Sequence, residues 1–191
     1  MIKIGITGGI GSGKSIVSEL FRLYGIPVYI ADVESKRLTE TSPIIKKGLS
    51  DLAGNDIYTE QGLNKKKLAT LIFNDKQMLN QVNKIIHPEV SCHFEHWVKQ
   101  QTSSVCAIES AILFESGFNT FVDKTLLIFA PEALRIKRAC KRDQTSAELV
   151  RQRIRNQLSD NIKKEWCDYV LYNDDKTALI PQIYALLKSF S

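Results

Sequence analysis

A glycine-rich segment near the start of the chain carries the clearest chemical signal in the sequence. Residues 8–15 read Gly-Gly-Ile-Gly-Ser-Gly-Lys-Ser and match the full pattern G-x-x-x-x-G-K-[ST]. Glycines adopt backbone angles closed to other residues and leave room for a phosphate, and the exposed N–H groups of such a loop form a nest for an anion. Lys14 is placed to neutralise the β- and γ-phosphate oxygens, and the Ser15 hydroxyl is placed to hold Mg²⁺. The segment predicts a phosphate-binding loop, or P-loop, for ATP.

The residues on both sides of this loop favour a true P-loop over a glycine-rich turn that matches the pattern by chance. Residues 2–7 form a short, apolar, β-branched run, which is typical of a buried strand. Residues 14–24 have the apolar spacing of an amphipathic helix and are followed by Gly25, a natural stop. The positive N-terminal end of that helix would face the phosphates. We expect the nucleotide contacts to come from Gly9, Gly11, Ser12, Gly13, Lys14, Ser15 and Ile16.

Strand-like and helix-like segments alternate along the chain, which predicts an α/β fold. Strands are expected at residues 2–7, 27–31, 105–108, 125–130 and 169–172, and helices at 14–24, 65–73, 75–101, 131–141, 146–158 and 178–190. Pro88 must kink or interrupt the long helix expected at residues 75–101, because proline lacks the backbone donor. This order favours a five-stranded parallel sheet with helices on both faces, the P-loop kinase fold. We expect a single domain over residues 1–191, with a helical acceptor-substrate insertion at 33–104 and a lid at 135–158.

Composition is that of an ordinary globular protein. Of 191 residues, 43% are hydrophobic and 25% are charged. No apolar run approaches the roughly 18 residues that a membrane-spanning helix needs, and the first residues resemble a strand more than a secretory signal. The cysteines are scattered and lack any Cys-x-x-Cys pair, which is typical of reduced thiols. We therefore expect a cytoplasmic protein with no membrane partner.

The net charge of +5 is concentrated in one segment. Residues 135–155 carry a net charge of +6, and the remainder carries −1. A local basic cluster favours a bound polyanion, either a triphosphate or a nucleic acid backbone. A nucleic-acid-binding regulatory protein would bind DNA or RNA in a salt-sensitive manner. The sequence disfavours that class, because it lacks a basic patch interleaved with aromatic residues, and we expect no nucleic-acid partner.

Among P-loop proteins, the sequence favours a small-molecule kinase. It lacks the Asn-Lys-x-Asp motif with which GTPases read guanine, and it is short for a motor or transporter ATPase. Arg135, Arg138 and Arg142 follow the spacing i, i+3, i+7 and would share one helix face. On a lid that closes over ATP, Arg138 and Arg142 could stabilise charge on the transferred phosphoryl group. The alternative for these arginines is a solvated helix face.

Two acidic residues stand at the carboxyl ends of expected strands, where ligands of open α/β sheets bind. Asp32 is a candidate general base for a hydroxyl acceptor, and its alternative role is a helix N-cap. Glu109 is a candidate magnesium-linked acid, and its alternatives are a capping or an ion-paired carboxylate. Glu115 is a weaker candidate of the same kind.

The histidines carry less information. His87 precedes Pro88 in the long helical pattern, and a lone histidine is more often structural than functional. Cys92, His93 and His96 lie close together but lack a fourth ligand at zinc spacing, so we expect no metal there.

The ordered set of motifs resembles the dephospho-CoA kinase family over residues 1–173. The resemblance begins with Ile-Thr ahead of the P-loop and continues with Gly-Ile-Pro-Val-Tyr-Ile-Ala-Asp at residues 25–32, Ile-Ile-His-Pro at 85–88 and Glu-Ser-Ala-Ile-Leu-Phe-Glu-Ser-Gly at 109–117. It extends through Arg138, Arg142, Arg153, Ile154, Gln157, Lys163, Asp168 and Asn173. The departures are Ile30 for the first aspartate of Asp-Ala-Asp, Glu109 for aspartate, Ala111 for proline, Arg135 for glutamine and Cys167 for alanine.

The resemblance implies transfer of the ATP γ-phosphoryl group to the ribose 3′-hydroxyl of dephospho-CoA, which gives CoA and ADP. It implies catalytic roles for Lys14, Asp32, Arg138 and Arg142, with Asp32 and His87 facing the acceptor substrate. It also implies a nucleotide contact from Asn173 and Mg²⁺ held near Ser15 and Glu109. Other small-molecule kinases of this fold, acting on nucleoside monophosphates or shikimate-type acceptors, form the alternative. Oligomeric state stays open.

Overall fold

The computed structural model describes residues 1–73 and 75–190, and its chain divides into two compact units. The first unit comprises Met1–Ile30 together with Gln101–Ser191, and the second comprises Ala31–Gln100. Chain connectivity therefore inserts the second unit after the second strand of the first.

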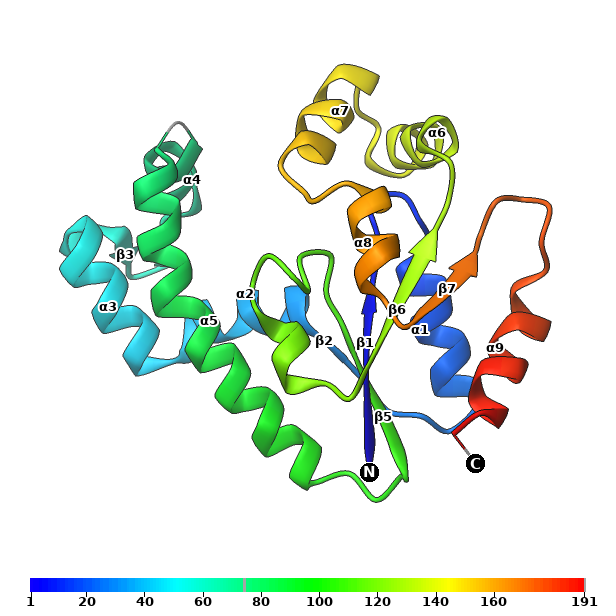
Figure 1. Cartoon of the computed structure of the whole chain (residues 1–191). Coiled ribbons are helices and arrows are strands. Elements are labelled where there is room, and N and C mark those ends of the chain that lie inside the picture. Colours follow the sequence, from blue (N-terminus) through cyan, green and yellow to red (C-terminus); the bar gives the residue numbers. More distant parts are fainter. Residues whose placement is uncertain (74, 191) are drawn as a thin grey trace. The chain divides into compact units, whose positions relative to one another are not determined.

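A parallel sheet of five strands forms the centre of the first unit (Figure 1). The strands are β1 (Ile2–Thr7), β2 (Val28–Ile30), β5 (Val105–Glu109), β6 (Lys124–Phe129) and β7 (Tyr169–Tyr172), and their order across the sheet is β2-β5-β1-β6-β7. Each neighbouring pair is parallel, with Ile4 opposite Ala107 on one side of β1 and opposite Lys124 on the other. The five-stranded parallel sheet expected from the sequence is confirmed.

Two helices cover one face of this sheet. They are α1 (Lys14–Leu23) and α9 (Leu179–Lys188), which contact each other. Ile4 and Ile6 of β1 are fully buried in one core with Phe21 of α1 and Ile183 of α9. Burial of such side chains stabilises the fold by roughly 1.5–3 kcal/mol each. The apolar face that the spacing of residues 14–24 indicates is thus the face that meets the sheet.

The opposite face of the sheet is covered by shorter segments. A Cβ added to Gly5 would lie 2.8 Å from a methyl group of Leu113, so the chain after β5 packs directly on β1. The short 3₁₀ helix η2 (Phe118–Phe121) also contacts β1, and α8 (Asp160–Trp166) contacts β6. Between β6 and α8 the chain forms α6 (Glu132–Asp143) and α7 (Ala147–Arg155), which contact each other in the region expected to be a lid.

The second unit is mostly helical. It contains α2 (Ala31–Thr41), α3 (Pro43–Ala53), η1 (Asn55–Ile57), the small antiparallel pair β3 (Tyr58–Thr59) and β4 (Gly62–Leu63), α4 (Lys65–Phe73) and α5 (Lys76–Lys99). The long helix α5 contacts α2, α3 and α4. Ile45, Leu49, Val82, Val90 and Phe94 are buried within this unit.

The helix α5 corrects one expectation from the sequence. The sequence predicts a kink or an interruption at Pro88; α5 continues from Lys76 to Lys99 with Pro88 inside it, so the interruption is wrong and the kink stays a prediction. The helix α5 contacts α2, α3 and α4, and tertiary packing can override the local preference of one residue. The Ser91 hydroxyl donates to the carbonyl of His87 at 3.0 Å within the same turn. The start of α5 is capped by Asp75, whose carboxylate accepts from the N–H groups of Gln77 and Met78 at 2.8 and 2.9 Å.

The structure also shows elements that the sequence did not indicate. These are the β3–β4 pair and the seven-residue helix α8. Cys92, Cys106, Cys140 and Cys167 are free thiols, as expected. Across the part of the chain that the structure describes, no helix combines the length and the apolar character needed to cross a bilayer.

Replacing Pro88 by alanine is expected to stabilise the protein. Pro88 is exposed, so its ring contributes little packing, and alanine would restore a backbone donor to α5. Proline costs about 3 kcal/mol relative to alanine inside a helix, so the free energy of unfolding should rise by about 1–3 kcal/mol in urea denaturation. Glu95→Ala, an exposed change in the same helix, is the control and should shift it by less than about 0.5 kcal/mol. An unchanged or lower value for Pro88→Ala would contradict the expectation.

Candidate active site

The P-loop follows β1 at the carboxyl edge of the sheet and leads directly into α1. Gly11 and Gly13 have φ angles of +77° and +93°, which other residues rarely adopt. Lys14 Nζ donates to the carbonyl of Gly8 at 3.0 Å, so the lysine side chain folds back along the loop. Gly13 precedes α1 without a side-chain cap, and Ser15 and Ile16 are exposed on the first helical turn. A helix terminus of this kind can bind an anion.

Side chains from later in the chain hold the outer side of the loop. The Nδ2 group of Asn173 donates to the carbonyl of Ser12 at 2.8 Å, and a Cβ at Gly13 would lie only 2.1 Å from that nitrogen. The N–H group of Ile10 donates to Oε1 of Gln157 at 3.2 Å. Asn173 stands one residue beyond β7, and its own N–H group donates to the carbonyl of Phe129 on β6. Asn173 is therefore buried and hydrogen-bonded to the P-loop, and its contact with the nucleotide stays a prediction.

The three spaced arginines of α6 lie in different surroundings. Arg138 donates to the carbonyl of Asn173 at 2.9 Å and forms an ion pair with Asp175. Arg142 is more exposed and forms an ion pair with Asp143 at 2.7 Å, which raises the pKa of Arg142 above its usual range. Arg135 is buried at 4% exposure. Although the spacing places all three on neighbouring turns, only Arg138 and Arg142 are accessible for a solvent-borne ligand.

The two residues expected to hold Mg²⁺ both lie in the first unit. Glu109 ends β5 and is buried, and its Oε2 accepts a hydrogen bond from the Ser18 hydroxyl at 2.6 Å. Ser15 is exposed one turn earlier on the same helix, α1. Hydroxyl and carboxylate oxygens suit Mg²⁺, which in kinases uses one or two protein ligands and the substrate phosphates. Among the described residues, no group of three or more His, Cys, Asp or Glu side chains could hold a metal by itself.

Glu115 has a structural role in this unit. Its carboxylate forms an ion pair with Lys163 at 3.2 Å and accepts from the N–H group of Leu158 at 2.8 Å. Lys163 is fully buried and also donates to the carbonyl of Ala111 at 2.9 Å. This buried amine ties α8 to the segment after β5.

Asp32 and His87 belong to the second unit. Asp32 is the second residue of α2 and is exposed, so the alternative in which it caps a following helix from outside is wrong. His87 lies within α5, and burial lowers its pKa below the usual range. The structure therefore places Asp32 in the first helical turn after β2, and His87 on the helix that organises the inserted unit.

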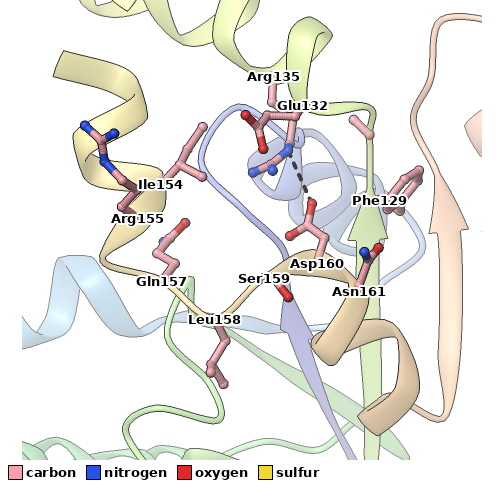
Figure 2. A pocket seen from close by; sticks show the side chains of 11 residues that line it. Phe129, Glu132, Arg135, Ile154, Arg155, Gln157, Leu158, Ser159, Asp160 and Asn161 are labelled. Carbon is pink, nitrogen blue, oxygen red and sulfur yellow. Dashed lines mark ion pairs between the residues drawn. The ribbon is translucent and has the colours of Figure 1, made fainter. Parts of the chain in front are cut away.

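A pocket of about 380 Å³ lies between the start of α6, the end of α7 and the start of α8 (Figure 2). Its lining includes Glu132, Arg155 and Gln157 together with Arg135 and Asp160. Asp160 was missed by the sequence analysis because α8 was missed. The signal was present, however, since Ser159 followed by Asp160 is a helix start, and the Ser159 hydroxyl accepts from the N–H group of Ile162 at 3.3 Å.

Sequence comparisons match this chain to dephospho-CoA kinases over nearly its whole length. The sequence model of the family described as dephospho-CoA kinase matches residues 2–178. A dephospho-CoA kinase of Bacteroides fragilis is 49% identical over 187 residues, which covers 97% of this chain and 91% of the relative. One from Porphyromonas gingivalis is 44% identical, with 99% and 94% covered.

Solved structures show the same fold. A crystal structure from Thermus thermophilus superposes with a TM-score of 0.87 at 31% identity, covering 100% of this chain and 98% of that one. A dephospho-CoA kinase from Campylobacter jejuni has a TM-score of 0.70 at 22% identity, with 99% and 96% covered. A shikimate kinase from Acinetobacter baumannii in complex with shikimate has a TM-score of 0.55 at 16% identity, with 99% and 92% covered, and shares the fold alone.

The parallel sheet, its P-loop and the similarity to dephospho-CoA kinases define a P-loop kinase, an enzyme that uses ATP. The chain belongs to the dephospho-CoA kinase family.

The brace of the P-loop by Asn173 can be tested with Asn173→Asp. A carboxylate cannot donate to the carbonyl of Ser12, and a buried acceptor left without its donor costs about 1–3 kcal/mol. The dissociation constant for ATP with magnesium, measured by calorimetry, should rise about tenfold or more. The control is Thr177→Ala, an exposed change in the same segment, which should leave ATP affinity within about twofold. Wild-type affinity for Asn173→Asp would show that the brace is not needed.

Proposed function

We propose that this chain transfers the γ-phosphoryl group of ATP to the ribose 3′-hydroxyl of dephospho-CoA, releasing CoA and ADP, the last step of coenzyme A biosynthesis. The match of nearly the whole chain to dephospho-CoA kinases carries this proposal. The intact P-loop, held from outside by Asn173 and Gln157, supports the ATP half of the reaction.

On the donor side, the P-loop N–H groups and Lys14 bind the phosphates. The Lys14 ammonium would move from the Gly8 carbonyl, 3.0 Å away, to the β- and γ-phosphate oxygens. Mg²⁺, when bound near Ser15 and Glu109, would neutralise charge on the same phosphates. Gly9, Gly11, Ser12, Gly13 and Ile16 complete the proposed set of nucleotide contacts.

The lid of this enzyme would consist of residues 135–158. Arg138 and Arg142 currently pair with the carboxylates of Asp175 and Asp143. When ATP binds, phosphoryl oxygens would replace these carboxylates as partners. Both arginines would then stabilise the charge that develops during transfer. The concentration of positive charge in this segment supports that role.

On the acceptor side, the inserted helical unit would bind dephospho-CoA. His87, whose pKa is lowered by burial, would contact this substrate as a neutral side chain. Asp32 would accept the proton of the 3′-hydroxyl as the oxygen attacks the γ-phosphorus. The bond from that phosphorus to the β,γ-bridging oxygen breaks, and ADP leaves. Asp32 suits this role because it is exposed and follows β2, which ends at the same sheet edge as β1.

An acceptor screen tests the proposal. ADP release would be measured by a coupled assay with dephospho-CoA, nucleoside monophosphates and shikimate as separate acceptors. We expect turnover with dephospho-CoA and product of the mass of CoA. Turnover on either other acceptor, with none on dephospho-CoA, would overturn the proposal in favour of another P-loop kinase.

A cytoplasmic location stays a prediction from the sequence.

The role of Asp32 is tested by Asp32→Asn. Loss of a general base lowers the rate by about 10²–10⁴-fold, so kcat should fall by that factor while the KM for ATP stays within about twofold. Glu34→Gln is the matched control, because Glu34 lies in the same first turn of α2 and pairs with Arg37 at 2.7 Å. It should retain wild-type kcat. If Asp32→Asn keeps wild-type kcat, Asp32 is not the base.

A further inference from the structure

A buried ion pair lies against the outer side of the P-loop. Arg135 Nε and Asp160 Oδ2 are 3.2 Å apart, and the two residues are only 4% and 9% exposed (Figure 2). Arg135 comes from α6, and Asp160 is the first residue of α8. Two helices of the segment between β6 and β7, separated by α7, therefore meet at this point.

Both members of the pair contact the backbone of the loop. Arg135 Nη1 donates to the carbonyl of Ile10 at 3.5 Å, and Asp160 Oδ1 lies 3.1 Å from where a Cβ of Gly9 would stand. The approach is so close that a Cβ at Gly9 would lie 1.8 Å from Arg135 Nη1. A Cβ at Gly11 would lie 2.2 Å from the carbonyl oxygen of Arg135. The pair thus fixes the position of residues 9–11.

The charge of Asp160 matters because the loop binds an anion. Burial raises the pKa of Asp160, and the positive charges of Arg135, Lys163 and Lys14 oppose that rise. Lys163 already pairs with Glu115, and Lys14 is required at the phosphates. Arg135 is therefore the partner that can neutralise Asp160 while ATP is bound. Without it, a buried carboxylate beside the loop would repel the triphosphate and attract Lys14.

The sequence also indicates that Arg135 and Asp160 act as a pair. Arg135 stands where the dephospho-CoA kinase family usually has glutamine, which is neutral. A buried arginine needs a counter-charge, and in this chain Asp160 supplies it from α8. The pair is not part of the Lys14, Asp32, Arg138 and Arg142 set.

We propose that Arg135 is a positioning residue that compensates the charge of Asp160 and holds the P-loop in the shape that binds the ATP phosphates. This inference rests on the proposed function only in that the loop binds ATP. If the ion pair only stabilised the fold, substitutions at the two positions would be coupled in unfolding but not in ATP binding. The proposed role requires that the effects of the two substitutions on ATP affinity depend on each other.

The test is a cycle of neutral substitutions. Arg135→Gln, Asp160→Asn and the double variant are compared with wild type by calorimetric titration of ATP and magnesium, without acceptor. Glutamine and asparagine remove the charges but keep polar amide side chains, so these variants test mainly the effect of charge. Arg135→Gln should weaken ATP binding by about tenfold or more, because Asp160 is then uncompensated. The double variant should return to within about threefold of wild type.

Two further variants separate charge from other effects. Arg135→Lys keeps the charge, so ATP affinity should stay within about threefold. Arg22→Gln removes one positive charge from an exposed pair with Glu19 on α1, so it should leave ATP affinity within about twofold. In Arg135→Gln the KM for ATP should rise more than kcat falls, since the reacting groups are intact.

Several results would overturn the inference. They are unchanged ATP affinity in Arg135→Gln, a double variant that binds no better than Arg135→Gln, or coupling in thermal unfolding without coupling in ATP affinity. If Arg135→Gln does not fold, the double variant is compared directly with wild type, and a loss of about tenfold or more overturns the inference. A wild-type protein that binds ATP without phosphorylating dephospho-CoA would refute the proposed function alone. One that binds no ATP would refute both.

Discussion

A phosphate loop can offer its N–H groups to an anion only if other atoms hold its backbone from outside. The glycines that make the loop permissive also remove the side chains that would otherwise fix it. In this protein the side chains that contact the loop from outside are those of Arg135, Gln157, Asp160 and Asn173. The ATP site is therefore a product of the later third of the chain as much as of residues 8–15.

The sheet makes this arrangement possible. Its strands are parallel, so β1, β6 and β7 end at one edge, and the segments that follow them meet there. The core beneath is formed by strand residues such as Ile4 and Ile6 with α1 and α9. On the other face, Lys163 and Glu115 fix α8 to the chain after β5. Packed segments on both faces of the sheet thus position the side chains that contact the P-loop.

Much of this fold follows from local patterns. The P-loop and the five strands were predictable, because short apolar runs and a complete motif are signals contained within a few residues. The role of Asp160 was not, because it depends on Arg135, 25 positions earlier, and on Gly9, still farther away in sequence. The interruption of the helix at Pro88 was wrongly predicted for the opposite reason, since a local rule does not take account of the packing of α5 against α2, α3 and α4. Asp32 was found as a strand-end carboxylate, and its role in catalysis stays a prediction.

The contact of Arg135 with the loop bears on how such a sequence can change over generations. A chain that acquired arginine at position 135 before aspartate at 160 would bury a lone cation, and the reverse order would bury a lone anion. Either intermediate buries an unpaired charge, which destabilises the protein, so a change at one position favours a matching change at the other. A recombinant gene with its crossover between them, joining this chain to a relative with glutamine at 135, would inherit half of the pair. Such hybrids should be impaired even when both parents are fully active.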